Sequence, residues 1–257
     1  MAPGDPNNGP RRSFLQPVLY WFVFYTVMAL FTVIYRIRRV NTGRIPREGP
    51  CLLVANHQSH LDPPLACMAN TARQTHFLAR GGLFSNRVFG WLIASLNSIP
   101  ISEEQSDVGA IREILKRLEQ GVPVLMFPEG SRTENGELQP FQRGVALLLK
   151  RAKCPVVPIA VEGCYDAWPR HRSFPRLLGC RVAVSVGKPM DAAELLKDGP
   201  DAALDRLASE IESMRLDLRA KLRASTKGRY PACGIGDQRS PHVSAGARES
   251  VQATPTA

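Results

Sequence analysis

The sequence predicts an α/β fold, with a central mixed and mostly parallel sheet flanked by helices and an N-terminal membrane helix. Two observations support this prediction. Between residues 50 and 190, short apolar runs alternate with segments of helical periodicity, which is the order expected for strands joined by crossover helices. Ahead of them, residues 17–35 carry no charged side chain, and these nineteen residues are long enough to cross a hydrocarbon core of about 30 Å as a helix.

The N-terminal part is expected to contain two segments. Residues 1–13 are rich in Pro, Gly and Asn and are predicted to be disordered, and residues 14–39 are predicted to form a membrane-anchoring helix. The uncharged run is too long for a signal peptide. Three arginines at 36–39 outweigh two at 11–12, so the positive-inside rule places the rest of the chain in the cytoplasm. The many aromatic side chains also fit a helix that lies in the membrane interface, and a buried helix of a soluble protein is a further alternative.

The domain expected at 40–224 opens with strands that alternate with helices. Each expected strand is a short apolar run bounded by Gly, Pro or polar residues. The first run is apolar throughout, as in a strand buried on both faces, whereas the last run alternates in polarity. The expected strands are 51–55, 76–79, 99–101, 122–127, 155–161 and 181–186.

The expected helices are recognised by their start, their stop or their apolar stripe. Asp62 and Pro63 suit the N-cap and N1 positions of a helix. The clearest helix has apolar residues three and four apart and ends at Gly121. After the last helix the composition turns to Ser, Gly, Pro, Ala and Gln, which predicts a disordered tail at 225–257. Besides the helix that starts at Asp62, the expected helices are 84–96, 107–120, 145–149 and 201–223.

The composition restricts the partners of the chain. A net charge of +10 and a pI of about 9.7 favour an anionic partner. The chain has no zinc-finger spacing and no RNA-recognition signature, and its uncharged N-terminal segment favours anionic membrane lipid over nucleic acid. None of the six cysteines forms a C-x-x-C pair. Cys51 and Cys154 are expected to be buried free thiols, in a reducing compartment.

A candidate base follows the first strand. His57 lies on the loop after that strand, at the edge of an open sheet where ligands gather. An imidazole with a pKa near ~6.5 can accept a proton at cytoplasmic pH, and Asp62, five residues on, is placed to orient it and to stabilise its cation. Two alternatives remain at this point: His57 as an ordinary loop histidine, and Asp62 as a helix cap.

Two neighbouring residues offer competing chemistry. His60 forms an H-x-x-H pattern with His57, but no third cluster of metal ligands appears, so no metal is expected. Ser59 lacks the G-x-S-x-G turn that would present a serine nucleophile. The base is therefore expected to activate the acceptor directly, without a covalent enzyme intermediate.

A candidate anion site lies at 127–133, after the strand at 122–127. A Pro-Glu-Gly sequence requires a sharp turn, which Gly130 allows. Exposed backbone N–H groups and the hydroxyl of Ser131 can then meet an anion, and Arg132 can hold a phosphate through two parallel hydrogen bonds. Glu129 is expected to orient Arg132 or the loop, and to assist the base. The alternative is an ordinary turn with a surface ion pair.

Together the two segments, Asn-His-x-Ser-x-x-Asp and Phe-Pro-Glu-Gly-Ser-Arg-Thr, resemble the 1-acylglycerol-3-phosphate acyltransferase (lysophosphatidic acid acyltransferase) family of glycerolipid acyltransferases, over roughly residues 45–190. The resemblance implies a glycerol-3-phosphate acyltransferase-like fold. It also implies a catalytic dyad of His57 and Asp62 and an acceptor-phosphate site. That site comprises Glu129, Gly130, Ser131, Arg132 and, where many members have a lysine, Arg80.

One segment departs from the family pattern. The family usually places an arginine just after an Ile-Pro-Val-type strand, but here Ser98-Ile99-Pro100-Ile101 is followed by Ser102-Glu103-Glu104. Losing one charge-assisted phosphate contact costs roughly 1.5–3 kcal/mol. Another lysophospholipid or a lyso-aminolipid is therefore an alternative acceptor to 1-acylglycerol-3-phosphate, unless Arg80 or Arg143 compensates.

The resemblance implies an O-acyltransferase of phospholipid biosynthesis. Acyl-CoA or acyl carrier protein would donate the chain, a lysophospholipid would accept it, and no cofactor is required. The enzyme would sit at the cell inner membrane or another cytoplasm-facing membrane, with its catalytic domain in the cytoplasm. The competing hypotheses are a lipid hydrolase or phosphatase that uses the same histidine, and a non-catalytic membrane protein that binds anionic lipid.

Overall fold

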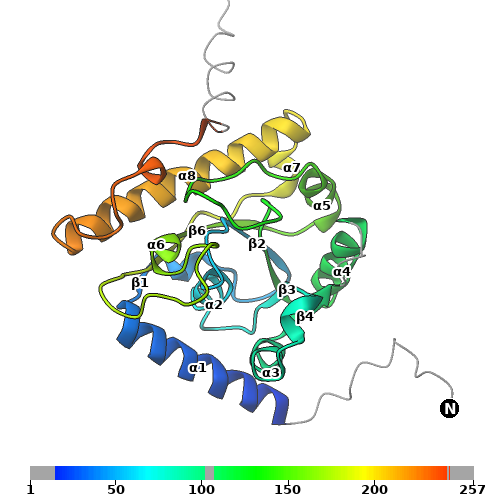
Figure 1. Ribbon diagram of the computed structural model, residues 1–257. Coiled ribbons are helices and arrows are strands. Elements are labelled where there is room, and N and C mark those ends of the chain that lie inside the picture. The colour runs from blue at the N-terminus through cyan, green and yellow to red at the C-terminus, as the bar shows by residue number, and fades with distance from the viewer. Residues whose placement is uncertain (1–14, 102–106, 242, 244–257) are drawn as a thin grey trace, which may run out of the picture.

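The computed structural model describes residues 15–101, 107–241 and 243, and it contains a seven-stranded sheet (Figure 1). The strand order is β1-β7-β6-β2-β5-β3-β4. All neighbouring strands are parallel except β6 and β7, which are antiparallel. The predicted mixed, mostly parallel sheet is therefore confirmed. The strands are β1 (Arg38–Val40), β2 (Cys51–Ala55), β3 (His76–Arg80), β4 (Ser98–Ile101), β5 (Pro123–Met126), β6 (Val156–Glu162) and β7 (Ala183–Val186).

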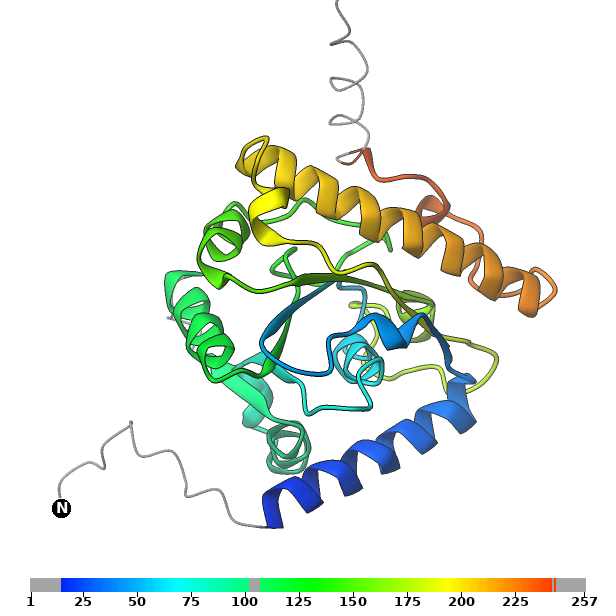
Figure 2. The same ribbon diagram turned by 180° about the vertical axis from the view of Figure 1, so that it is seen from behind.

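Helices cover both faces of the sheet, which explains why the central strands are apolar throughout. In β2, Cys51, Leu53 and Ala55 join the core on one face, and Leu52 and Val54 join the core on the other. The first face packs against α1 (Leu15–Tyr35), α2 (Asp62–Cys67), α3 (Arg87–Ser95) and α6 (Cys164–Ala167). The second face packs against α4 (Asp107–Glu119), α5 (Gly144–Ala152), α7 (Ala192–Leu195) and α8 (Pro200–Ser225), as the view from behind shows (Figure 2). Short 3₁₀ turns lie at η1 (Thr42–Arg44), η2 (Gly81–Phe84) and η3 (Ile235–Asp237).

The N-terminal helix α1 has the length and composition of a membrane helix, with 21 residues and a mean hydropathy of 1.9 over its most apolar 18 residues. It lies along one side of the domain in both views (Figures 1 and 2). Tyr20, Val23 and Phe24 are buried against the domain, and the hydroxyl of Tyr20 accepts a hydrogen bond from the N–H of Thr75 at 3.2 Å. The helix is therefore docked on the domain rather than held away from it.

The helix ends earlier than the predicted 14–39. Arg36 has a left-handed backbone, with φ at 48°, and this conformation ends the helix after Tyr35. The N–H of Arg38 then donates to the carbonyl of Val182 at 3.0 Å, so residues 38–40 form the edge strand β1. Two of the three arginines predicted to flank the membrane helix, Arg38 and Arg39, therefore belong to the sheet.

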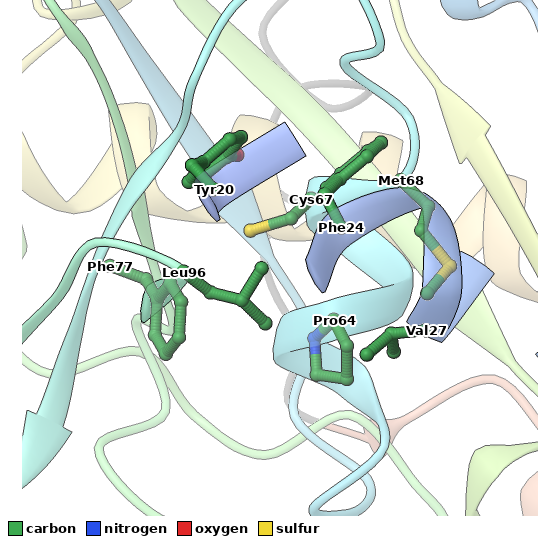
Figure 3. A pocket seen from close by; sticks show the side chains of 8 residues that line it. All are labelled: Tyr20, Phe24, Val27, Pro64, Cys67, Met68, Phe77 and Leu96. Carbon is green, nitrogen blue, oxygen red and sulfur yellow. The ribbon is translucent and has the colours of Figure 1, made fainter. Parts of the chain in front are cut away.

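A small apolar recess lies between α1, α2, β3 and the end of α3 (Figure 3). It encloses about 260 Å³ of empty space, counting its opening to solvent. None of its lining residues belongs to the predicted catalytic or anion site. They are Tyr20, Phe24, Val27, Pro64, Cys67, Met68, Phe77 and Leu96.

The segment after α8 differs from the predicted disordered tail. Residues 226–241 pack back along α8, and Ser240 and Val243 are buried. Arg215 and Arg219 of α8 donate to the carbonyls of Gly236 and Ala232 in this segment. Composition alone did not indicate this packing because the segment has little apolar periodicity, and its order comes largely from hydrogen bonds to arginines. Residues 1–13 and 244–257 lie outside the described residues.

Candidate active site

The two sequence motifs meet at one edge of the sheet. β2 and β5 are adjacent and parallel, so the loops that follow them leave the same edge. The ring of His57 stacks on the ring of Phe127, with centroids 4.1 Å apart. The N–H of Thr133 donates to the carbonyl of His57 at 2.9 Å. Two segments far apart in the chain therefore form one loop cluster.

His57 and Asp62 form a hydrogen-bonded pair. Nδ1 of His57 lies 2.9 Å from Oδ2 of Asp62. The carboxylate is fully buried, whereas 18% of the His57 side chain is exposed. An ionised carboxylate can only accept, so it selects the tautomer with hydrogen on Nδ1 and leaves Nε2 free to take a proton. The arrangement has the parts of a general base and its orienting acid.

Asp62 does not cap its helix. Leu61 occupies the N-cap position of α2, and no side chain caps that helix. Instead Oδ2 of Asp62 accepts hydrogen bonds from the backbone N–H groups of Gln58 and Ser59 as well as from His57. The predicted capping role is wrong because the side chain turns back over the loop that precedes the helix. The backbone bonds hold the carboxylate in place for His57.

Glu129 holds the loop of His57 through hydrogen bonds to backbone N–H groups. Its side chain is buried, and it accepts hydrogen bonds from the N–H of His57 at 2.5 Å and from the N–H of Gln139 at 2.8 Å. Burial raises the pKa of Glu129 well above its usual value, although the two backbone donors oppose that shift. Within the described residues Glu129 forms no ion pair with Arg132. Glu129 was predicted to orient either Arg132 or the loop, and its hydrogen bonds fit the second of these roles.

The turn after Glu129 presents backbone and cationic groups at the surface. Gly130 has φ at 73°, in the region that favours glycine. Ser131 is exposed and Arg132 is partly buried. The guanidinium of Arg80 donates to the carbonyl of Gly130 at 3.3 Å, which ties Arg80 to this turn. Arg80 therefore lies next to the second motif.

Arg132 is available to an anion. No hydrogen bond or ion pair joins its side chain to another residue in the described part of the chain. Burial lowers the pKa of Arg132, and the neighbouring charges of Arg170 and Arg80 lower it further, while Asp62 raises it. We refer to Arg80, Arg132 and Arg170 as the cationic cluster: Arg80 and Arg170 both repel Arg132, and Arg170 also pairs with Glu134 at 3.8 Å. A phosphate dianion would relieve that repulsion.

Two further residues of the first motif, His60 and Ser59, both contact Trp168. Burial, together with the charge of Arg132 and the proximity of His57, lowers the pKa of His60 to about 4. Its ring packs beside Trp168, with centroids 5.2 Å apart. Ser59 is buried, and its hydroxyl donates to the carbonyl of Trp168 at 2.8 Å. Among the described residues no group of three or more His, Cys, Asp or Glu side chains is placed to hold a metal ion.

Two residues whose roles the sequence did not predict hold the loop of His57 in place. The amide of Asn56 exchanges two hydrogen bonds with the backbone of Val161, at 2.8 and 3.0 Å. The amide of Gln58 donates to Oε2 of Glu162 at 3.1 Å. Asn56 and Gln58 lie on either side of His57 in the first motif. This position is the only feature of the sequence that could have indicated their role. The acidic segment predicted to affect phosphate binding, 102–104, lies outside the described residues.

Comparison with known proteins adds an independent finding. A family model described as "Acyltransferase" matches residues 36–162. The chain is 30% identical over 213 residues to the 1-acyl-sn-glycerol-3-phosphate acyltransferase of Streptococcus pneumoniae, covering 77% of this chain and 75% of that protein. It is 31% identical over 124 residues to a chloroplastic 1-acyl-sn-glycerol-3-phosphate acyltransferase of Brassica napus, covering 48% of this chain and 36% of that longer protein.

The fold is also similar to a solved structure. The crystal structure of the 1-acyl-sn-glycerophosphate acyltransferase of Thermotoga maritima superposes with a TM-score of 0.58, covering 88% of this chain and 86% of that chain. Sequence identity over the superposition is 21%. At that identity the likeness concerns the fold alone.

Proposed function

Because the chain belongs to the 1-acyl-sn-glycerol-3-phosphate acyltransferase family and is thus an O-acyltransferase, we propose that it converts 1-acylglycerol-3-phosphate to phosphatidic acid. An acyl thioester, either acyl-CoA or acyl carrier protein, donates the chain. The observation that supports this most strongly is the His57–Asp62 pair at 2.9 Å, directly beside the loop that carries Arg132.

In the proposed reaction one proton moves from the acceptor hydroxyl to His57 and then to the leaving thiolate. Nε2 of His57 takes the proton from the free hydroxyl of the acceptor as its oxygen attacks the thioester carbon. The new C–O ester bond forms, the C–S bond breaks, and the thiolate leaves. The imidazolium, stabilised by Asp62, then returns the proton to the thiolate. No covalent enzyme intermediate is needed.

The cationic cluster binds the acceptor. Arg132 takes the phosphate through paired hydrogen bonds, with Arg80 as a second contact and the backbone of Gly130 and the hydroxyl of Ser131 as further donors. Glu129 contributes indirectly by holding the backbone of His57. Binding the phosphate at this turn brings the acceptor hydroxyl towards the imidazole, because the two loops are in contact.

The enzyme works at a membrane that faces the cytoplasm, such as the cell inner membrane, with the catalytic domain on the cytoplasmic side. The arginines after α1 favour the cytoplasmic leaflet, whose anionic lipids attract basic side chains. Because one side of α1 is buried against the domain, we place the helix in the membrane interface, where its exposed side contacts lipid. An amphiphilic acceptor then reaches the site from the lipid surface.

An acceptor panel tests the proposal. The purified protein is given radiolabelled acyl-CoA or acyl carrier protein with 1-acylglycerol-3-phosphate, other lysophospholipids, a lyso-aminolipid, or no acceptor. The expected result is labelled phosphatidic acid, which His57→Ala abolishes while its melting temperature stays near that of the parent. Lys221→Met, which changes an exposed residue of α8, serves as the matched control and retains activity. Near-normal turnover by His57→Ala in the same assay contradicts the assigned role of His57.

One sequence feature supports a second candidate acceptor. Ser102, Glu103 and Glu104 stand where the family usually has an arginine. Fewer phosphate contacts favour a lysophospholipid with a less charged head group. Higher kcat/KM for such a lipid than for 1-acylglycerol-3-phosphate would identify it as the preferred acceptor. Fatty acid release without any acceptor would instead indicate a hydrolase, and lipid binding without transfer to any acceptor would indicate a non-catalytic protein.

A further inference from the structure

A loop beside the candidate site exposes apolar side chains that the proposed chemistry does not use. It covers residues 169–181, between α6 and β7. Phe174 is 80% exposed, Leu177 55% and Leu178 88%. Large apolar side chains grouped on one exposed loop are unfavourable in water and commonly mark a contact surface.

The same loop is strongly cationic. Residues 169–181 contain four arginines, at 170, 172, 176 and 181, together with His171 and no acidic residue. A lipid interface has a layer of phosphates above a layer of acyl chains. Arginines interleaved with exposed Phe and Leu fit both layers, because the guanidinium groups can reach the phosphates while the apolar side chains enter the acyl layer. A purely protein partner would have to supply an acidic rim and an apolar centre at once.

The loop is held in shape at its base. The indole N–H of Trp168 donates to the carbonyl of Arg172 at 2.9 Å, and the N–H of Arg176 donates to the carbonyl of Ala167 at 2.8 Å. Cys180 is buried at the far end. Trp168 also packs beside His60, three residues from His57. The base of the loop therefore adjoins the candidate site while its tip projects outward.

The loop is continuous with the surface of α1. In both ribbon views it lies beside the C-terminal end of that helix (Figures 1 and 2). The N–H of Val182, just after the loop, donates to the carbonyl of Tyr35 at 3.3 Å. On α1, Phe22, Leu30 and Val33 are exposed apolar residues. A lipid surface that touched this end of α1 would lie next to the loop tip.

We propose that residues 169–181 form a second membrane-contact element, in which Phe174, Leu177 and Leu178 enter the interface of an anionic phospholipid bilayer and the loop arginines contact lipid phosphates. The inference rests on the proposed membrane contact of α1. Through Trp168 the loop contacts His60, three residues from His57, so the loop forms the edge over which a lipid acceptor enters the site.

Spin-label depth measurements test this inference on the full chain. Among the described residues Cys233 is the one exposed cysteine, so Cys233→Ser provides the background. Single labels are placed at Leu178→Cys in the loop, at Val33→Cys on α1, and at Ile235→Cys as the matched control. Ile235 is also an exposed apolar residue, 53% exposed. It belongs to η3, and this orange-red segment lies on the side of α8 away from α1 (Figures 1 and 2). The proteins are placed in nanodiscs of phosphatidylcholine, with and without phosphatidylglycerol.

Each outcome decides one point. In discs that contain phosphatidylglycerol, we expect the label at 178 to collide several-fold more often with oxygen than with a polar nickel chelate, which is the behaviour of a label in lipid. The label at 235 should collide more often with the nickel chelate, which is the behaviour of a label in water. Arg172→Glu should move the 178 label towards water in those discs only. A label at 178 that behaves like the one at 235 overturns the inference. If the label at 33 is in lipid at the same time, membrane contact by α1 stands and only the loop inference fails.

Discussion

Replacing the buried arginine of α8 tests how the C-terminal segment and the catalytic loop are held together. Arg215 is fully buried, as are Glu162 and Glu212. Its guanidinium donates to Glu212 at 2.7 and 3.0 Å, to Glu162 at 3.2 Å and to the carbonyl of Gly236 at 2.8 Å. Glu162 in turn accepts from the amide of Gln58, next to His57. Arg215→Met removes the charge and all of these bonds.

The size of the effect follows from burial. Removing one partner of a buried ion pair lowers the free energy of unfolding by about 3–5 kcal/mol, because the carboxylate of the other partner stays buried without a compensating charge. For a domain of this size 1 kcal/mol changes the melting temperature by about 2–4 °C. Arg215→Met should therefore lower the melting temperature by about 6–20 °C. Glu162 keeps its ion pair with Arg219 at 2.7 Å, so the carboxylate left without a cation is that of Glu212, and the support of Gln58 should persist.

Thermal unfolding followed by tryptophan fluorescence measures this difference in detergent. The matched control is Lys221→Met, which removes the exposed ion pair with Asp217 on the same helix. An exposed pair contributes about 0–1 kcal/mol, so this control should lower the melting temperature by less than about 4 °C. Adding Glu212→Gln to Arg215→Met should recover part of the loss, since it removes one uncompensated charge.

Two results would refute the reasoning. If Arg215→Met and Lys221→Met melt within about 2 °C of each other, the buried cluster does not carry the stability assigned to it. If Glu212→Gln lowers the melting temperature of Arg215→Met further, the cost does not come from an uncompensated carboxylate.

The other predictions concern the site and the thiols. Asp62→Asn should lower kcat about 10³–10⁴-fold with the fold retained, because an amide N–H facing Nδ1 reverses the tautomer of His57; a loss below tenfold in the acyl-transfer assay would argue against the dyad. Arg132→Lys should raise KM for a phosphate-bearing acceptor about tenfold with little change in kcat, because paired hydrogen bonds are lost. The pKa of His60 is lowered to about 4 in the fold, so unfolding takes up a proton below its usual pKa, and stability should fall as the pH drops from about 6.5 to 4; melting curves of His60→Gln should show a smaller fall over that window. In the native protein one cysteine, Cys233, should react quickly with a thiol reagent at pH 8, while the five buried ones react only after unfolding.

Local patterns were sufficient for most of the secondary structure. The run at 51–55 is a buried strand because every residue in it is apolar, and both faces of the sheet are covered by helices. The apolar stripe predicted at 201–223 became α8, Pro200–Ser225. β1 was not predicted, since Arg38, Arg39 and Val40 carry no strand pattern and pair with β7 only through the fold. Pairing with a distant strand leaves no local signal.

The sequence by itself determined where the proposed site lies, because both motifs directly follow strands and parallel strands bring their loops to one edge of the sheet. It also determined the residue types of the proposed base, its acid and the anion site. Only the tertiary structure decided how they are held. Glu129 reaches a backbone N–H 72 residues away, and Arg215 and Arg219 order the segment after α8. Such contacts depend on which buried donors and acceptors meet after folding, and this depends on packing between distant segments rather than on any local pattern.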